Sequence, residues 1–349
     1  MKKILMALSI MAALTLTTAQ TVFADQHHND HPGNLTTVNA NLGSGIHVKI
    51  AVQVMENPRA DRNGITAICV PGMGHTAESF KPLVRALFAS NPHVRKVVLF
   101  DLPGHGDSGL PTGRHDVPYL GDLGISDYSF VTYDVLAACN NNDIYPSVMI
   151  GHSMGAFVSF VLEDELESCD SSLQEQFGID DLYTLGAAAP GNVLDPTLES
   201  GDILTYLEFY YETSDPVLGN ILSVDQYSFQ ALFFSDLSGQ VVADAPSPEE
   251  IDLLGYRSAE SATAVTQTVG PIADRPSVSP GIFSPRNGTR LHLLFGSQDQ
   301  YSLQSVQTDL GLFLTGKKKG ADVRMISSPD AVHDQFISNP EAVADALDL

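Results

Sequence analysis

Short apolar segments alternate with helical segments along most of this chain of 349 residues. Runs of about four to eight apolar residues indicate buried strands, whereas apolar residues three and four positions apart indicate helices. The expected strands are residues 47–54, 65–70, 94–100, 147–150, 182–189, 290–295 and 322–326. The expected helices are residues 78–89, 128–139, 154–168, 303–314 and a last one that starts at residue 341. This alternation predicts an α/β fold, with a mostly parallel sheet flanked by helices on both faces.

The alternation is interrupted between residues 190 and 285. This segment is rich in aromatic and acidic residues, and its prolines cluster toward its C-terminal end. Strand–helix alternation resumes after it. We therefore expect a single domain over residues 46–349, with an inserted cap at about residues 190–285 that covers the sheet.

The first 24 residues have the pattern of a secretory signal peptide. Lys2 and Lys3 give a positive start, residues 4–16 are apolar, and Ala24 is a small residue suited to a cleavage site. About 13 apolar residues are too few to span a bilayer, which argues against a stable membrane anchor. We expect cleavage after Ala24 and a secreted protein, either periplasmic or extracellular.

The charge balance of the chain argues against polyanionic partners. The sequence has 18 Lys and Arg residues against 42 Asp and Glu residues, a net charge of −24, and losing Lys2 and Lys3 would deepen it to −26. Nucleic acids and anionic lipids are bound through clusters of Lys and Arg. We therefore expect no nucleic-acid partner, and we interpret the acid excess as a solubility feature.

Residues 25–45 are polar, aperiodic and rich in Gly and Asn, which indicates a flexible leader. Cleavage after Ala24 would make Asp25-Gln26-His27 the new N-terminus. Its amine, two backbone amides and the His27 imidazole can hold Cu(II) or Ni(II) in a square plane. A disordered polar leader that binds no metal is the simpler interpretation.

Export also permits disulfide bonds. Cys139 and Cys169 each lie at the end of a predicted helix, and these helices flank the strand at 147–150. Right-handed connections would place the two helix ends side by side. The sequence leaves open whether these cysteines form a disulfide.

The most specific motif is Gly151-His152-Ser153-Met154-Gly155. It follows an apolar strand and opens a helix, which is the arrangement of a nucleophile elbow. Glycines flank such a serine because side chains there would collide with the neighbouring strand and helix. A glycine-rich turn without a catalytic role would share the pattern, so the strand–helix context decides. Ser153 is the predicted nucleophile.

A serine nucleophile needs a general base and an acid that orients this base. Only His292 and His333 follow Ser153 in the chain. His292 lies within a predicted strand, where a packed histidine is expected, whereas His333 lies in a loop after the last strand and is the predicted base. Asp299 follows a strand and would emerge on the same rim of the sheet, in the chain order expected for this architecture. Asp195 is the alternative acid.

The oxyanion of a reacting carbonyl needs backbone N–H donors. One is expected from Met154, directly after the nucleophile, and one from Met73 in the early glycine-rich turn. Gly72 and Gly74 let the backbone in this turn approach a substrate closely. An ordinary turn at the end of a strand would show the same glycines.

Five segments together resemble the alpha/beta-hydrolase family. They are Pro71-Gly72-Met73-Gly74-His75, Phe100-Asp101-Leu102-Pro103-Gly104-His105-Gly106-Asp107-Ser108, Gly151-His152-Ser153-Met154-Gly155, Gly296-Ser297-Gln298-Asp299 and Val332-His333. The resemblance covers roughly residues 46–190 and 286–349. Two positions depart from the family pattern. Pro71 stands where many relatives have His, and Val332 stands where the residue before the catalytic histidine is usually Gly.

The resemblance implies a catalytic triad of Ser153, Asp299 and His333 that acts by two-step acyl transfer, without a metal or cofactor. Haloalkane dehalogenases and epoxide hydrolases of this family use Asp as nucleophile, so Ser153 argues against both activities. The motifs are specific for the family and carry little information about the substrate.

Substrate contacts are expected from Gly72, Gly74, His152, Phe209 and Phe233. The two phenylalanines belong to an aromatic set in the cap whose main role is expected to be packing against the sheet. Some of this set can instead line an apolar pocket.

These expectations together describe a secreted serine esterase or lipase-like enzyme that cleaves a carboxylic ester of a small, mostly apolar substrate. A lactonase, perhydrolase or acyltransferase would use the same triad. A non-catalytic ligand-binding protein on this fold is the alternative outside enzymes, and an intact triad argues against it.

Overall fold

The computed structural model describes residues 35–43, 45–72, 74–113, 123–190, 193, 233–247, 250, 276–284, 288–316 and 321–349. These residues form one eight-stranded sheet with the strand order β1-β2-β4-β3-β5-β6-β7-β8. The strands are β1 (Thr37–Gly43), β2 (Ile46–Glu56), β3 (Ile65–Val70), β4 (Val94–Phe100), β5 (Val148–His152), β6 (Asp181–Leu185), β7 (Arg290–Gly296) and β8 (Asp322–Ile326). Strands β1 and β2 run antiparallel, and β3 to β8 pair in parallel. The predicted α/β fold with a mostly parallel sheet is confirmed.

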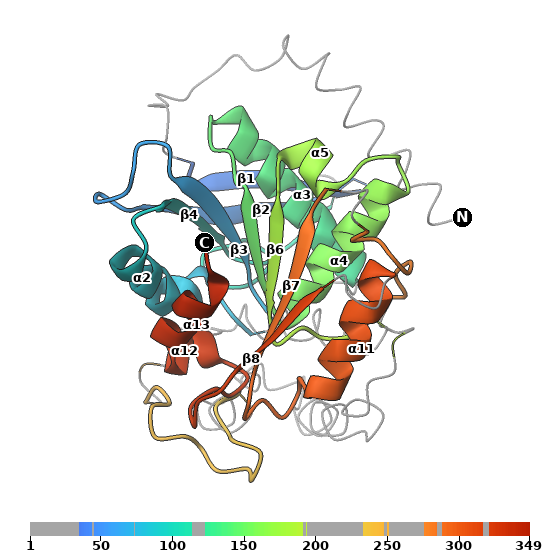
Figure 1. The fold of residues 1–349 in the computed structure, drawn as a ribbon. Helices are drawn as coiled ribbons and strands as arrows, with labels where there is room; N and C mark the ends of the chain where they lie inside the picture. The colour runs from blue at the N-terminus through green and yellow to red at the C-terminus, as the bar shows by residue number, and fades with distance from the viewer. Residues whose placement is uncertain are drawn as a thin grey trace, which may run out of the picture.

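Helices cover both faces of this sheet (Figure 1). They are η2 (Ala77–Phe80), α2 (Lys81–Ser90), α3 (Ile125–Asn141), α4 (Met154–Glu167), α5 (Leu173–Phe177), α11 (Gln304–Thr315), α12 (Gln335–Ser338) and α13 (Pro340–Leu347). Helices α2, α12 and α13 pack on one face, and α3, α4 and α11 pack on the other.

Strand β3 shows how the sequence produces two buried faces. Ala67 and Cys69 belong to the core beneath α2 and α13, whereas Ile68 and Val70 belong to the core beneath α3 and α4. Successive side chains of a strand point to opposite faces, so a strand covered on both sides must be apolar throughout. The continuous apolar segment at 65–70 therefore identifies a central strand of the sheet.

The predicted flexible leader, residues 25–45, extends too far along the chain, because residues 37–43 form strand β1. Val38, Ala40 and Leu42 of this strand are buried, which is the alternation of a strand with one covered face. The edge strand is held to α3, where Asp134 accepts a hydrogen bond from the backbone N–H of Asn41 at 2.7 Å. The polar residues between the buried ones conceal this alternation in the sequence.

Two other expectations about local structure are corrected. Strand β6 ends at Leu185 and not at residue 189, because Gly186 takes a left-handed conformation (φ +60°) that turns the chain. Helix α3 begins at Ile125, earlier than expected, and Asp127 caps it by accepting the backbone N–H of Gly124 at 2.6 Å.

All three cysteines lie in described segments and are free, so the structure contains no Cys139–Cys169 disulfide. Burial raises the pKa of the Cys139 thiol to about 12, which keeps the thiol protonated and unreactive.

The predicted cap and the N-terminal segment lie largely outside the described residues. Within the cap, residues 233–247 pack over the loop that follows β8. Phe233 and Phe234 of the cap contact Val332 of that loop. Residues 276–284 lie along α11, where the N–H of Gly281 bonds the carbonyl of Phe313 at 2.9 Å. Among the described helices, none has the length and apolar character needed to cross a membrane.

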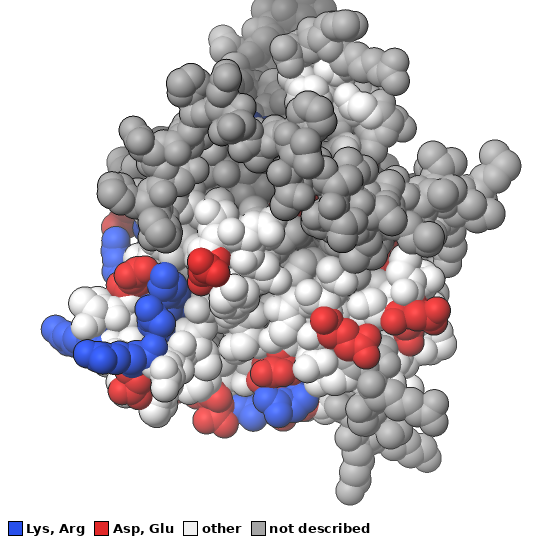
Figure 2. All heavy atoms as spheres, turned by 90° about the horizontal axis from the view of Figure 1, so that it is seen from above, with Lys and Arg blue, Asp and Glu red and all other residues white. Residues whose placement is uncertain are grey.

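One face of the molecule shows how its charges are arranged. Figure 2 looks along the sheet from above, and its described Lys and Arg side chains gather at the left and at the lower edge of the view, with Asp and Glu side chains beside each group. Within the described residues, Arg290 pairs with Asp181 and Arg324 with Asp322.

Candidate active site

Ser153 occupies the sharp turn between β5 and α4. Its backbone has φ +50° and ψ −115°, in a region that residues other than glycine rarely adopt. Its N–H donates to the carbonyl of Leu185 at 3.0 Å, which ties the turn to the end of the next strand. A strained residue held this firmly at the carboxyl edge of a sheet is typical of a functional position.

The glycines on either side of this turn are required by close packing. A Cβ at Gly155 would overlap the backbone carbonyl of Val70, and a Cβ at Gly151 would lie 2.7 Å from Cα of Ala156. Strand β3 and helix α4 could not approach the turn with any larger residue there. This packing supplies the physical reason for the spacing of the motif.

Asp299 and His333 lie next to each other at the same edge of the sheet. The Nδ1 atom of His333 is 3.1 Å from both carboxylate oxygens of Asp299. Oδ1 of Asp299 also accepts the backbone N–H groups of Tyr301 and Ser302, at 2.8 Å and 3.1 Å. Asp299 is therefore fixed in an orientation that holds the imidazole.

A close packing contact also brings together the two loops that carry this pair. Gly296 ends β7, and a Cβ at this position would overlap the carbonyl of Ala331. The N–H of Gln298 donates to the same carbonyl at 2.9 Å. The loop after β7 and the loop after β8 thus pack directly against each other, which sets the spacing of Asp299 and His333.

The imidazole of His333 is almost fully buried, with 4% of the residue exposed. Burial lowers the pKa of His333, but the neighbouring carboxylates of Asp299 and Asp334 outweigh this effect, and the net shift is upward. Around the ring, Phe233 stacks at 5.7 Å between centroids, and Tyr301 presents its edge at 5.0 Å. An imidazole in this setting can gain a proton and remain stabilised by its carboxylate partner.

The expected oxyanion donors are placed in part. Met154 is the first residue of α4, where a backbone N–H has no partner within the helix. A Cβ at Gly72 would lie 3.2 Å from Cβ of Ser153, so the early turn closely approaches the nucleophile. Gly74 has φ +79°, which requires glycine. Met73 lies outside the described residues.

Comparison with known proteins shows the family of this chain. A sequence profile described as the alpha/beta hydrolase family matches residues 67–346. The chain belongs to the alpha/beta hydrolase family. No curated protein sequence shows significant similarity to it.

Solved structures of similar shape are alpha/beta hydrolases of low sequence identity. An esterase from Thermogutta terrifontis is 16% identical, covers 89% of this chain and 96% of its own, and has a TM-score of 0.57. An enol-lactonase from Burkholderia xenovorans LB400 is 15% identical, with coverages of 86% and 95% and a TM-score of 0.58. A bromoperoxidase from Bacillus anthracis is 15% identical, with coverages of 89% and 98% and a TM-score of 0.55. At these identities the likeness establishes the fold.

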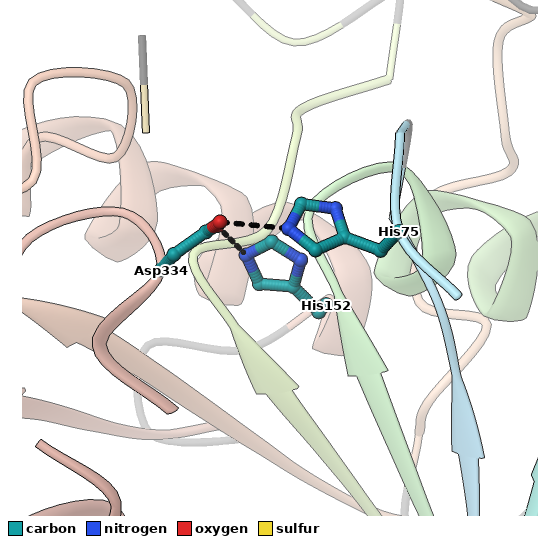
Figure 3. A group of neighbouring side chains, drawn as sticks. All are labelled: His75, His152 and Asp334. Atoms are coloured by element: carbon teal, nitrogen blue, oxygen red, sulfur yellow. Dashed lines mark hydrogen bonds and ion pairs between the residues drawn. The ribbon is translucent and has the colours of Figure 1, made fainter. Parts of the chain in front are cut away.

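This alpha/beta hydrolase also carries a second buried cluster beside its predicted triad, formed by His75, His152 and Asp334 (Figure 3). Nε2 of His75 lies 2.7 Å from Oδ2 of Asp334, and Nε2 of His152 lies 3.3 Å from Oδ1. All three side chains are fully buried. Two imidazole nitrogens and a carboxylate oxygen could ligate a metal ion. Here they pair with one another, so an ion would have to displace these contacts.

The expectation that His152 contacts substrate is corrected by this cluster. Its side chain has no exposed surface, and its Nε2 faces Asp334 and the backbone carbonyl of His333. Desolvation, then the neighbouring His75 and His333, lower the pKa of His152 well below its usual range. His152 is therefore a neutral, internal residue beneath the elbow.

The remaining predicted residues fall in three groups. Phe233 lies against His333, as described above, whereas Phe209, Asp195, Asp25 and His27 lie outside the described residues. His292 is packed as expected, stacked on Tyr183 at 4.2 Å with Nε2 2.9 Å from Asp181.

The sequence reasoning missed two residues of the second cluster. His75 follows the early glycine turn, and Asp334 directly follows the predicted base. The sequence signal for this cluster was the acidic Asp334 next to the predicted base, together with His75 in the glycine-rich turn.

Proposed function

We propose that this protein is a serine hydrolase that cleaves a carboxylic ester of a small, mostly apolar substrate through an acyl-enzyme. The observation that carries the proposal is the buried Asp299–His333 pair at 3.1 Å, on the rim that also carries the elbow residue Ser153. A carboxylate, an imidazole and a hydroxyl in this chain order form the working unit of serine hydrolases on this fold.

The reaction would proceed in two steps. His333 takes the proton of the Ser153 hydroxyl while Oγ attacks the carbonyl carbon, and Asp299 stabilises the resulting imidazolium. The N–H of Met154 and the turn at residues 72–74 would bind the oxyanion. The imidazolium then protonates the leaving alcohol, and a water molecule activated by His333 releases the acid from Ser153.

The surroundings of His333 support an apolar substrate. Phe233, Phe234 and Val332 form a small apolar cluster beside the catalytic loop, with Tyr301 packed against it. Tyr301 is only partly buried beside His333, so an acyl or alcohol group of low polarity could lose water on contact with its ring, which would favour binding. A lactone is a cyclic ester and would react by the same steps, so lactones belong in the substrate series.

A fluorophosphonate probe tests the proposal. The wild-type protein should be labelled at a single serine, and Ser153→Ala should abolish labelling and ester hydrolysis. Ser168→Ala, which changes an exposed serine just after α4, is the matched control and should behave like wild type. Labelling or turnover that survives in Ser153→Ala would refute the serine mechanism.

We also propose that the protein is exported and that cleavage after Ala24 releases it. The charged start, apolar stretch and small cleavage residue of the first 24 positions support this proposal. Amino-terminal sequencing of the protein from the periplasm and the medium tests it, and a mature chain that retains Lys2 would refute it. A chain that starts at Asp25 can then be titrated with Cu(II), where a visible d–d band near neutral pH would reveal binding through His27.

A further inference from the structure

Three loops that carry predicted catalytic groups meet at the carboxylate of Asp334. His75 lies in the turn after β3, His152 directly precedes Ser153 in the elbow, and Asp334 directly follows His333 in the loop after β8. The rings of His75 and His152 both point at this carboxylate, one at each oxygen (Figure 3). One buried side chain therefore contacts the oxyanion turn, the nucleophile elbow and the loop of the general base.

Asp334 is fixed through its backbone as well as its side chain. Its N–H donates to the carbonyl of Phe233 at 3.2 Å, and its carbonyl accepts the N–H of Ile337 at 2.9 Å. As the N-cap of α12 it also anchors a helix end. Since His333 is the preceding residue, these contacts determine where the backbone of His333 lies.

The proton positions in the cluster follow from its contacts. Nδ1 of His152 is buried and has no hydrogen-bond partner, and a Cβ at Gly72 would lie 2.8 Å from it. The proton of this neutral ring is therefore on Nε2, where it can be donated to the carbonyl of His333 at 3.3 Å. Nε2 of His75 donates to Oδ2 of Asp334 at 2.7 Å. Oδ2 of the carboxylate thus accepts a hydrogen bond from His75, whereas Oδ1 lies 3.3 Å from Nε2 of His152 and has no hydrogen-bond partner among the described residues.

We propose that Asp334 is a positioning residue, which fixes His333 relative to the elbow and the oxyanion turn through His75 and His152. The inference rests on the proposed serine hydrolase function. Asp334 also places a second carboxylate near the imidazole that Asp299 already binds. The other groups that face His333 are His152, Phe233 and Tyr301, and at neutral pH none of these carries a negative charge.

A role in chain packing alone would predict a different result from the proposal. If Asp334 only filled space, replacing its carboxylate by the isosteric amide would change stability and leave the basicity of His333 unaltered. A positioning role predicts changes in the pKa of His333 and in its reactivity while the fold is kept. The test therefore needs a readout of His333 itself.

The first experiment measures the pKa of His333 by NMR, in the Ser153→Ala background. Introducing Asp334→Asn should lower this pKa by on the order of 1 unit, because one of two nearby carboxylates loses its charge. Asp330→Asn removes a charge from the same loop, where the Asp330 side chain lies near the surface, and is the matched control. It should leave the pKa of His333 almost unchanged.

The second experiment measures the rate of fluorophosphonate labelling as a function of pH. At pH 7, Asp334→Asn should lower the rate on the order of 10- to 100-fold, as expected for a misplaced base. His75→Leu should cause a similar loss, and His75→Gln, which keeps an N–H donor for Asp334, should recover most of it. Thermal melting identifies variants that fail to fold. If Asp334→Asn fails to fold, the comparison of His75→Leu with His75→Gln tests the proposal.

The outcomes separate the two proposals. If wild type is not labelled at Ser153, the serine hydrolase function fails, yet the NMR measurement still reports on Asp334. If labelling is normal and folded Asp334→Asn leaves both the pKa of His333 and the rate unchanged, the positioning role is wrong. Equal losses in His75→Gln and His75→Leu would also contradict it, because the hydrogen bond to Asp334 would then be irrelevant.

Discussion

Gly186 lies so close to Asp299 that a Cβ at position 186 would stand 2.8 Å from the carboxylate Oδ2, and 3.1 Å from Nδ1 of His333. Gly186→Ala should therefore push the acid and the base apart and lower ester hydrolysis by about 100-fold or more. Gly178→Ala is the matched control, since Gly178 also has a positive φ (+78°) but has open space around its Cα. Gly178→Ala should lose about 1 kcal/mol of stability, because a Cβ is disfavoured at positive φ, and should keep its activity. Steady-state kinetics and thermal melts of both variants test this, and an active Gly186→Ala would contradict the packing.

Replacing Asp299 by its amide should lower activity more than the clash that Gly186→Ala introduces. In Asp299→Asn the side-chain amide can donate to Nδ1 of His333, which would place the imidazole in the wrong tautomer to accept the serine proton. A loss in kcat on the order of 10⁴-fold is expected, as for such changes in other triads. Turnover of an activated ester measures it. A loss of less than about tenfold would mean that another carboxylate fills the role.

The acid limb of the activity profile should be set by His333. The imidazole must be neutral to take a proton, and Asp299 and Asp334 outweigh the opposite effect of burial and raise its pKa above 6.5. The labelling rate should therefore be low at acid pH and rise with pH, with a midpoint above 6.5. Rate constants measured between about pH 5 and pH 9 with a non-ionisable probe give the midpoint. A midpoint well below 6.5 would assign the base to another group.

Stability should also depend on pH, through a buried carboxyl on α4. Burial raises the pKa of Glu163 to about 8 from 4.5, and its Oε1 has no hydrogen-bond partner while Oε2 accepts the N–H of Leu173 at 2.7 Å. The folded protein keeps this proton after the unfolded chain has released it. The free energy of unfolding should therefore fall as pH rises from about 4.5 to about 8.

In Glu163→Gln no proton is released from this side chain on unfolding, and the amide oxygen can still accept the N–H of Leu173. At pH 8.5 the variant should be more stable than wild type, by on the order of 2–4 kcal/mol. The difference should shrink toward zero below about pH 4, where Glu163 of the wild type holds its proton in both the folded and the unfolded protein. Urea melts at the two pH values measure this. A constant difference at both would show that Glu163 is ionised in the folded protein.

Local patterns predict those parts of the fold that are determined by residues close together in the sequence. The segment from β5 through Ser153 to α4 is predicted because its apolar strand, tight turn and helix are contiguous, and its glycines report close packing. Asp299 and His333 are predicted because each follows a strand of a parallel sheet. Strand β1 is missed because its polar residues hide three buried ones, Val38, Ala40 and Leu42.

The His75–Asp334 contact could not be predicted in the same way. These residues are 259 positions apart, and no local pattern links the glycine-rich turn that contains His75 to Asp334. Their contact depends on how the turn after β3 and the loop after β8 converge across the sheet, which involves strands that are not neighbours. Only the assembled fold brings the two side chains together.

The pairing of β6 with β7 has a consequence for how the chain folds. Asp181 and Arg290 face each other across these adjacent strands although 109 positions separate them, so a long stretch of chain must close before β7 can join the sheet. Closing such a loop costs entropy before any contact compensates for it, which slows folding. Asp299 and His333 both follow this closure in the chain. Regained activity should therefore report the last events of refolding, after most helical structure has already formed.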